Sequence, residues 1–261
     1  MTSSGISEQG SGSNGVRHQP IGPICPEQVD RLAMFHRWDL LTFLHWSYDP
    51  AVVQRLLPPG LSVETFEDRA WVGLVPFQME VRAPRGPALP WISHFCETNV
   101  RTYVTASDGT RGVWFFSLDA ARLAAVVTAR TTYRLPYFWS EMSLSQAGST
   151  MTYACRRRWP GARNVSSRVQ IRIGERFGPD ELTERDHYLT ARWRLYSHQR
   201  RGLRAAIAFH EPWTLHRAEV VQLDDELFTA AGLPDPHGDP IVHWSPGVEV
   251  RIGLPHGVAF T

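Results

Sequence analysis

The segment HFCETNVRTYVT, residues 94–105, decides the fold class because its polar and apolar residues alternate with the period of a β-strand. One face would carry Cys96, Thr98, Val100, Thr102 and Val104, and the other Phe95, Glu97, Asn99, Arg101 and Tyr103. Asp108 and Gly109 then form a hairpin-turn signal before a second strand, RGVWFFS. The sequence therefore predicts an antiparallel strand pair here.

Outward from this hairpin, most of the chain has the pattern of further strands. They are predicted at 70–79, 151–159, 165–173, 191–197, 203–210, 215–222 and 247–252, and Pro76 makes the first an edge strand or a bulge. Short helices are predicted after Asp49 and Pro50, over 119–130 with Asp119 near its start, and at 179–189 and 224–232. Hairpins with interspersed helices favour a mainly β, α+β fold, an antiparallel sheet or barrel with helices outside.

Composition places the chain among globular proteins. It has 261 residues, 43% of them hydrophobic, and a net charge of +1, which excludes a field strong enough to attract nucleic acid or an anionic membrane. The run Arg156 to Arg158 is interpreted as the solvated edge of one strand. Three unpaired cysteines indicate a reducing cytoplasm, and no apolar run is long enough to span a membrane.

The first residues are rich in Gly, Ser and Gln and lack the features of a signal peptide. We therefore expect a disordered tail over residues 1–27 and a single domain over residues 28–261.

Two clusters carry the side chains that chemistry needs. The first is the face with Glu97, Asn99 and Arg101, because charges that alternate with the rings of Phe95 and Tyr103 are typical of a ligand pocket, although a solvated face has the same pattern. The second is ARTTYRLPYFW, residues 129–139, which holds Arg130, Tyr133, Tyr137 and Trp139; buried packing explains its rings equally well. The eleven histidines match no zinc spacing, so we expect neither a metal nor a cofactor.

Several long motifs resemble the YqjF-like family of uncharacterised bacterial proteins. They include AWVGLVPFQM, FCETNVRTYV, GVWFFSLDA and HWSPGVEV, and the resemblance runs from about residue 33 to about residue 255. That family is similar to the acetoacetate decarboxylase-like superfamily. The resemblance implies an antiparallel β-barrel or cone around a closed, largely apolar pocket, and it suggests a homo-oligomer.

The resemblance also bears on mechanism. In the decarboxylases a Gly-Arg-Glu segment leads into Pro-Lys-Lys, whose first lysine forms a Schiff base with the substrate. Laid on this chain, the arginine falls on Arg130, the proline on Pro136 and the lysines on Tyr137 and Phe138, while a pocket glutamate corresponds to Glu97. All 27 basic residues of this chain are arginine. The Schiff-base mechanism is therefore excluded, since arginine stays protonated and is no nucleophile.

Three readings of function follow. In the first, a lysine-independent isomerase, lyase or cyclase acts on a small oxo or enol metabolite, such as one of secondary metabolism. Its catalytic residues would be Glu97, Tyr137 and Arg130, with Arg101, Tyr103, Phe95, Tyr133 and Trp139 binding substrate. In the second, the barrel binds or senses a metabolite without turnover, and Glu97 pairs with Arg130. In the third, the charged face only meets solvent.

Overall fold

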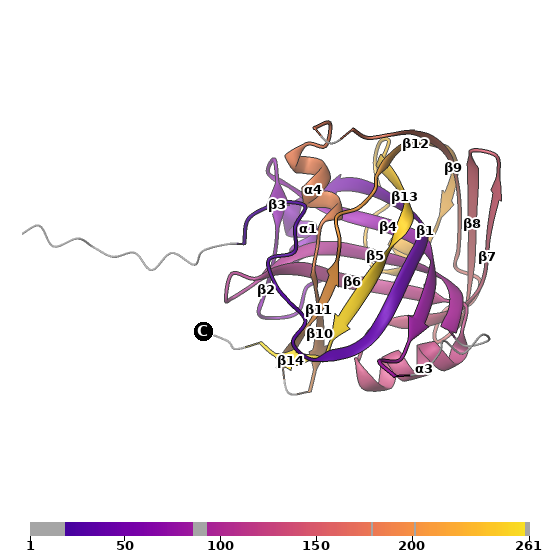
Figure 1. The fold of residues 1–261 in the computed structure, drawn as a ribbon. Helices are drawn as coiled ribbons and strands as arrows, with labels where there is room; N and C mark the ends of the chain where they lie inside the picture. Colours follow the sequence, from indigo (N-terminus) through magenta and orange to yellow (C-terminus); the bar gives the residue numbers. More distant parts are fainter. Residues whose placement is uncertain (1–18, 86–92, 179, 201, 259–261) are drawn as a thin grey trace, which may run out of the picture.

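The computed structural model describes residues 19–85, 93–178, 180–200 and 202–258, which form one sheet of fourteen strands and four helices (Figure 1). The strands are β1 (Leu32–Tyr48), β2 (Leu61–Val63), β3 (Thr65–Phe66), β4 (Arg69–Arg82), β5 (His94–Ala106), β6 (Arg111–Ala120), β7 (Tyr137–Ala147), β8 (Thr150–Trp159), β9 (Ser166–Arg176), β10 (Arg194–Gln199), β11 (Gly202–His210), β12 (His216–Asp225), β13 (Ile241–Gly253) and β14 (His256–Gly257). The helices are α1 (Pro50–Gln54), α3 (Leu123–Thr132), α4 (Glu184–Thr190) and α5 (Leu227–Ala230). The prediction of a mainly β fold with short peripheral helices is confirmed.

The expectation of a purely antiparallel sheet is wrong at β6. This strand pairs in parallel with β7, where Leu118 faces Tyr137, and with β10, where Val113 faces Leu195. Parallel neighbours need a crossover, and the chain between β6 and β7 supplies one by forming α3 before it returns beside β6. Helix α3 is thus part of a single βαβ unit.

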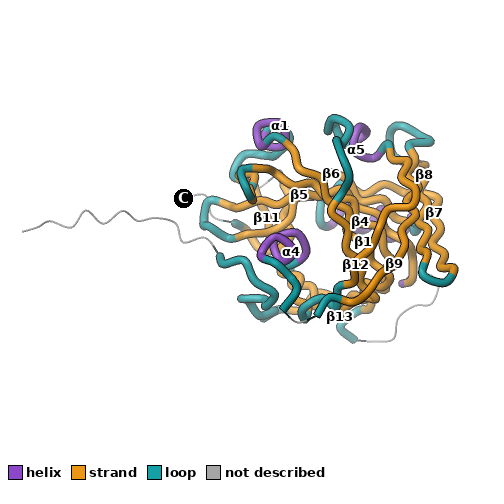
Figure 2. The backbone as a smooth tube through the Cα atoms, turned by 90° about the horizontal axis from the view of Figure 1, so that it is seen from above, coloured by secondary structure: helices purple, strands orange, loops and turns teal. Residues whose placement is uncertain are grey.

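The strand pairings close the sheet into two rings that share β13, β1, β4, β5 and β6. In one ring β11 and β10 link β13 back to β6, and in the other β12, β9, β8 and β7 make this link. Seen from above, the strands follow a ring (Figure 2). Strand β5 therefore lies in a wall between two compartments.

Both faces of β5 are covered as a result. Val100 packs in an apolar core with Leu74 and Ile171, inside the ring that contains β8 and β9. On the opposite face Glu97 is 2% exposed and Arg101 is 8% exposed. The reading in which this face meets bulk solvent is therefore wrong, because the second ring covers it.

A buried ion pair joins β6 to β8 across β7. The Arg157 Nε and Nη2 donate to the Asp119 carboxylate at 2.9 and 2.6 Å, and the Ser140 hydroxyl donates to it at 2.7 Å. The Arg157 guanidinium also lies 3.6 Å from the centroid of the Phe138 ring. Two expectations are corrected here: Asp119 belongs to β6 rather than to a helix start, and Arg157 is buried rather than solvated.

Local signals set the helix starts and one irregularity of the sheet. Asp49 caps α1 and Thr183 forms a capping box with Asp186 at the start of α4, while Pro179 of the predicted 179–189 helix lies outside the described residues. Pro76 lies where the register between β1 and β4 shifts, as expected for a bulge. It is not on an edge strand, however, because β4 lies between β1 and β5.

The N-terminal segment shows where packed structure begins. Residues 1–18 of the predicted tail lie outside the described residues. Within 19–27, Gln19 accepts from the Arg111 backbone N–H at 3.1 Å and donates to Glu27, which pairs with Arg194. These contacts join Gln19 to Arg111 of β6 and Glu27 to Arg194 of β10. Within the described part of the chain, no helix has the length and apolar character needed to cross a membrane.

The two neighbouring arginines on β8 allow a matched test of the Asp119 ion pair. We expect Arg157→Met to lower the free energy of unfolding by about 3–5 kcal/mol, because it leaves the Asp119 carboxylate buried without a cation. Arg158 pairs with Glu141 at the surface, so Arg158→Met should cost at most about 1 kcal/mol. Urea unfolding of both variants measures the difference, and equal losses would contradict a structural role for the buried pair.

Candidate functional site

A cavity of about 330 Å³ lies on the inner side of the shared strands, beneath α3. Most of its wall is apolar, and the volume suits a small organic ligand. The lining residues are Met34, His36, Trp38, Leu41, Val75, Phe77, Met79, Val81, Ser93, Phe95, Glu97, Asn99, Arg101, Phe115, Leu118, Ala124, Ala125, Thr128, Ala129, Tyr133, Leu135, Tyr137, Leu195, Trp213 and Ile252. Its polar groups are few, and three of them are consecutive inward residues of β5.

Glu97 is the acidic group of this wall. Tyr137, the first residue of β7, donates its hydroxyl to Glu97 Oε2 at 2.9 Å, and Asn99 also hydrogen-bonds the carboxyl. The parallel pairing of β6 with β7 brings the two together, because it sets Tyr137 opposite Leu118 beside the end of β5. Among the described residues, no arginine or histidine lies within ion-pair distance of Glu97.

Burial raises the pKa of Glu97 from 4.5 to about 8, because water that would stabilise the carboxylate is excluded. Hydrogen bonds from Tyr137 and Asn99 oppose this shift, and the negative charge of Asp119 adds to it. Burial and the nearby carboxyl also raise the pKa of Tyr137 well above its usual value, so the phenol stays protonated. The pair can therefore donate or accept a proton near neutral pH.

Arg101 is the cationic group of the same wall. Its side chain is 8% exposed, and its guanidinium lies 5.3 Å from the Phe43 ring centroid and 5.9 Å from that of Tyr103. Its Nε and Nη2 atoms have no hydrogen-bond partner, and no carboxylate within the described residues forms an ion pair with it. Part of its donor capacity is thus left for a bound molecule.

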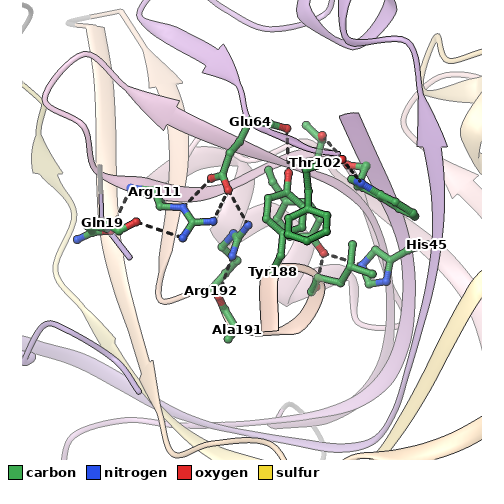
Figure 3. A network of polar contacts seen from close by, with 12 residues as sticks. Gln19, His45, Glu64, Thr102, Arg111, Tyr188, Ala191 and Arg192 are labelled. Atoms are coloured by element: carbon green, nitrogen blue, oxygen red, sulfur yellow. Dashed lines mark hydrogen bonds and ion pairs between the residues drawn. The ribbon is translucent and has the colours of Figure 1, made fainter. Parts of the chain in front are cut away.

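A polar network lies beyond Arg101, around Tyr103. The Tyr103 hydroxyl donates to the Leu189 carbonyl and is 2.6 Å from His45 Nε2. In the same network Glu64 lies between Arg111 and Arg192 (Figure 3), and the Arg192 guanidinium is 4.5 Å from the Tyr103 ring centroid. Gly73 permits this packing, since a Cβ there would lie 2.8 Å from His45 Nε2.

The structure distributes the sequence-predicted site residues between the cavity and its surroundings. Glu97, Tyr137, Arg101, Phe95 and Tyr133 line the cavity, and Tyr133 does so from the C-terminal end of α3. Tyr103 lies on the same face of β5 but belongs to the polar network, not to the lining.

Arg130 and Trp139 lie outside the cavity lining. Arg130 Nη1 donates to the Tyr137 backbone carbonyl at 2.7 Å, and its guanidinium lies against the rings of Phe138 and Trp159. It forms no ion pair with Glu97. Trp139 lines a separate pocket, together with Leu123, Val127 and Trp159. The expected ion pair of Glu97 with Arg130 is therefore not formed.

Sequence reasoning missed several groups that line the cavity. Strand alternation places Asn99 on the predicted face but indicates no chemical role for it, and its Oδ1 has no partner in the described residues. Met34, His36 and Trp38 also line the cavity from β1, and burial lowers the pKa of His36 to about 4, so it is neutral. The alternation of these three residues could have revealed that face. No group of three His, Cys, Asp or Glu within the described ranges is arranged to hold a metal ion.

Comparison with known proteins gives a family and a fold. Residues 36–249 match the DUF2071 family, described as an uncharacterized conserved protein. The chain is 33% identical over 213 residues to the uncharacterized protein YqjF of Bacillus subtilis strain 168, which covers 81% of this chain and 87% of that protein. The family predicted from the sequence motifs is thereby confirmed.

Solved structures with similar folds are far more distant in sequence. Acetoacetate decarboxylase from Legionella pneumophila has a TM-score of 0.58 at 13% identity, covering 90% of this chain and 92% of the other. The enduracididine biosynthesis enzyme MppR, solved with pyruvate, has a TM-score of 0.61 at 13% identity, covering 91% and 97%. At this identity the comparison shows that the chain has an acetoacetate decarboxylase-like fold.

The raised pKa of Glu97 makes a prediction about stability. Between pH 4.5 and about 8, the unfolded chain releases the Glu97 proton while the folded chain keeps it, so stability falls as pH rises. In Glu97→Gln this loss is absent. We therefore expect the free energy of unfolding of the variant, relative to that of the wild type, to increase by about 1.4 kcal/mol per pH unit across that window.

Urea unfolding of both proteins at several pH values measures this gain. Because the variant and the wild type share all other titrating groups, the difference between them isolates Glu97. A difference in unfolding free energy that does not change with pH would show that Glu97 ionises at its ordinary pKa.

Proposed function

We propose that this chain, which belongs to the DUF2071 family, is an enzyme that moves a proton on a small oxo or enol metabolite without forming a Schiff base. The observation that carries the proposal is the Glu97 carboxyl, which is buried in the cavity and held by the Tyr137 hydroxyl at 2.9 Å. A carboxyl with a pKa near the working pH is suited to both general-acid and general-base catalysis.

The chemistry follows from these two groups. The ionised fraction of Glu97 would accept a proton from the carbon next to the substrate carbonyl, which leaves an enol or enolate. The Tyr137 hydroxyl would donate a hydrogen bond to Glu97 or to the substrate oxygen as negative charge develops there. Return of the proton to another atom of the substrate would complete an isomerisation, and loss of a leaving group would complete an elimination.

The fold comparison supports a substrate with a carbonyl group, since MppR has been solved with pyruvate, which is an oxo acid. The absence of lysine excludes an imine intermediate on a side chain in this chain. By the resemblance, Tyr137 stands where the decarboxylases have the reactive lysine. The proposal therefore assigns acid and base chemistry to a scaffold that is otherwise similar to theirs.

Exchange of carbon-bound hydrogen tests the proposal without knowledge of the natural substrate. We expect the wild type to accelerate deuterium exchange into at least one of pyruvate, oxobutanoate and oxopentanoate in deuterated buffer, followed by proton NMR. Glu97→Gln should slow this exchange by about 100-fold or more, since the base is lost. Glu141→Gln, which changes an exposed carboxyl on β7, should leave the rate unchanged. An unchanged rate in Glu97→Gln would refute the assignment of the base.

The pH dependence of the same exchange gives a second prediction. Because only the ionised carboxyl can accept a proton, the rate should rise about tenfold per pH unit and level off above pH 8, the pKa of Glu97. A plateau that begins near pH 4.5 would contradict this. A compound that binds the wild type but is never exchanged would instead favour a protein that binds metabolites without turnover.

A further inference from the structure

The geometry points to a monocarboxylic acid as the ligand of the cavity, with its carboxylate on Arg101 and its oxo or enol carbon at Glu97. This substrate class rests on the proposed function, because the position of the reacting carbon is taken from it. The binding of the carboxylate by Arg101 stands on separate observations. These are the unpaired donors of Arg101, the charges around it and the order of groups along β5.

Arg101 has the donors that a carboxylate needs. Its side chain is 8% exposed and lines the cavity, and its Nε and Nη2 have no hydrogen-bond partner within the described residues. The rings of Phe43 and Tyr103 lie against the guanidinium at 5.3 and 5.9 Å and attract the cation. Arg101 also hydrogen-bonds the Tyr103 hydroxyl, but this contact leaves its Nε and Nη2 without an acceptor among the described residues. A ligand carboxylate can accept from two N–H groups of one guanidinium at once.

The charges beyond Arg101 favour an anion as well. Two cations, Arg111 and Arg192, share the single carboxylate of Glu64, as Figure 3 shows. Arg192 lies 4.5 Å from the Tyr103 ring centroid, the same ring that Arg101 contacts. Together the three guanidinium groups exceed the Glu64 carboxylate by two positive charges, so this end of the cavity is electropositive.

The carboxylate of Asp186 does not balance the excess. Asp186, on α4, accepts from Thr183 and lies 3.0 Å from His243 Nε2. These partners occupy its carboxylate, and it forms no ion pair with Arg101. A bound carboxylate would therefore supply a compensating charge for Arg101.

The order of groups along β5 orients the ligand. Glu97 and Arg101 are four residues apart on one face, so their Cα atoms are separated by about 13 Å. No ion pair joins them, and Asn99 lies between them with an unpaired Oδ1 that can accept from a hydroxyl or enol O–H. Helices α3 and α4 lie at opposite ends of the barrel, and α3 lines the end with Tyr137 (Figure 1).

The wall between the two ends is apolar. It includes Val75, Phe77 and Leu118, which offer no hydrogen bond to a ligand. A ligand that matches the cavity from Arg101 through the apolar wall to Glu97 has a carboxylate at one end, an apolar middle and an oxo or enol group at the other end. The cavity thus selects for an amphiphilic acid rather than for a neutral ketone.

Two probes with the same carbon skeleton but a different charge test whether Arg101 binds a ligand carboxylate. Isothermal titration of the wild type with phenylbutanoate and with phenylbutanamide compares a carboxylate with its neutral amide. We expect the carboxylate to bind about 10- to 100-fold more tightly, the range of a hydrogen bond to a charged group. In Arg101→Gln this preference should disappear. Arg172→Gln, which removes the same charge from an exposed pair on β9, should retain it.

A second variant covers the case in which Arg101→Gln does not fold. Arg101→Lys keeps the charge but loses the paired donors, so it should keep a reduced preference for the carboxylate, with a circular dichroism melt as the folding control. Equal affinities of the two probes for the wild type would overturn the proposal. A preference that persists in Arg101→Gln, or no binding of phenylbutanoate at millimolar concentration, would overturn it too.

The outcome is separable from that of the proposed function. Glu97→Gln should keep the preference for phenylbutanoate, because Glu97 does not contact the carboxylate in this arrangement. If hydrogen exchange fails while the charge preference holds, the cavity binds acids but does not catalyse proton transfer. If exchange depends on Glu97 while the preference is absent, the base is correct and Arg101 is not the anchor.

Discussion

The burial of Glu97 without a cation beside it is the constraint on which the site depends. A carboxyl on a barrel strand normally has one face of the sheet open to solvent, where it ionises. Here β5 belongs to a wall shared by two rings of strands, so both of its faces are covered. Exclusion of water then raises the pKa of Glu97, and the hydrogen bond from Tyr137 fixes its position without neutralising it.

The position of Tyr137 depends in turn on the crossover between β6 and β7. Because α3 returns the chain in parallel beside β6, the first residue of β7 meets the end of β5 where Glu97 lies. The Asp119–Arg157 pair, with Ser140 and Phe138, ties β6, β7 and β8 together directly behind this point. The Asp119–Arg157 ion pair and the Glu97–Tyr137 pair are therefore neighbours. The charge of the Asp119 carboxylate is compensated by an arginine, whereas no cation compensates the Glu97 carboxyl.

Local patterns in the sequence predicted the parts of the site that lie on one strand. The alternation of β5 places Phe95, Glu97 and Arg101 on one face, and the structure has them lining one cavity. The same period could not predict Arg130 or Arg157, because their surroundings depend on how distant strands meet. Arg130 packs outside on Phe138 and Trp159, and Arg157 reaches a carboxylate 38 positions earlier in the chain. The parallel pairing of β6 was missed for a similar reason, since a single crossover helix has no signature in composition.

The pKa of Glu97 can be measured by following its protonated carboxyl. Infrared difference spectra of the wild type against Glu97→Gln, recorded across a pH titration, follow the carbonyl band of the protonated carboxyl. We expect this band to be present at neutral pH and to be lost with a midpoint near pH 8. Loss of the band near pH 4.5 would show that Glu97 is solvated or paired with a cation, and would contradict its burial without a compensating charge.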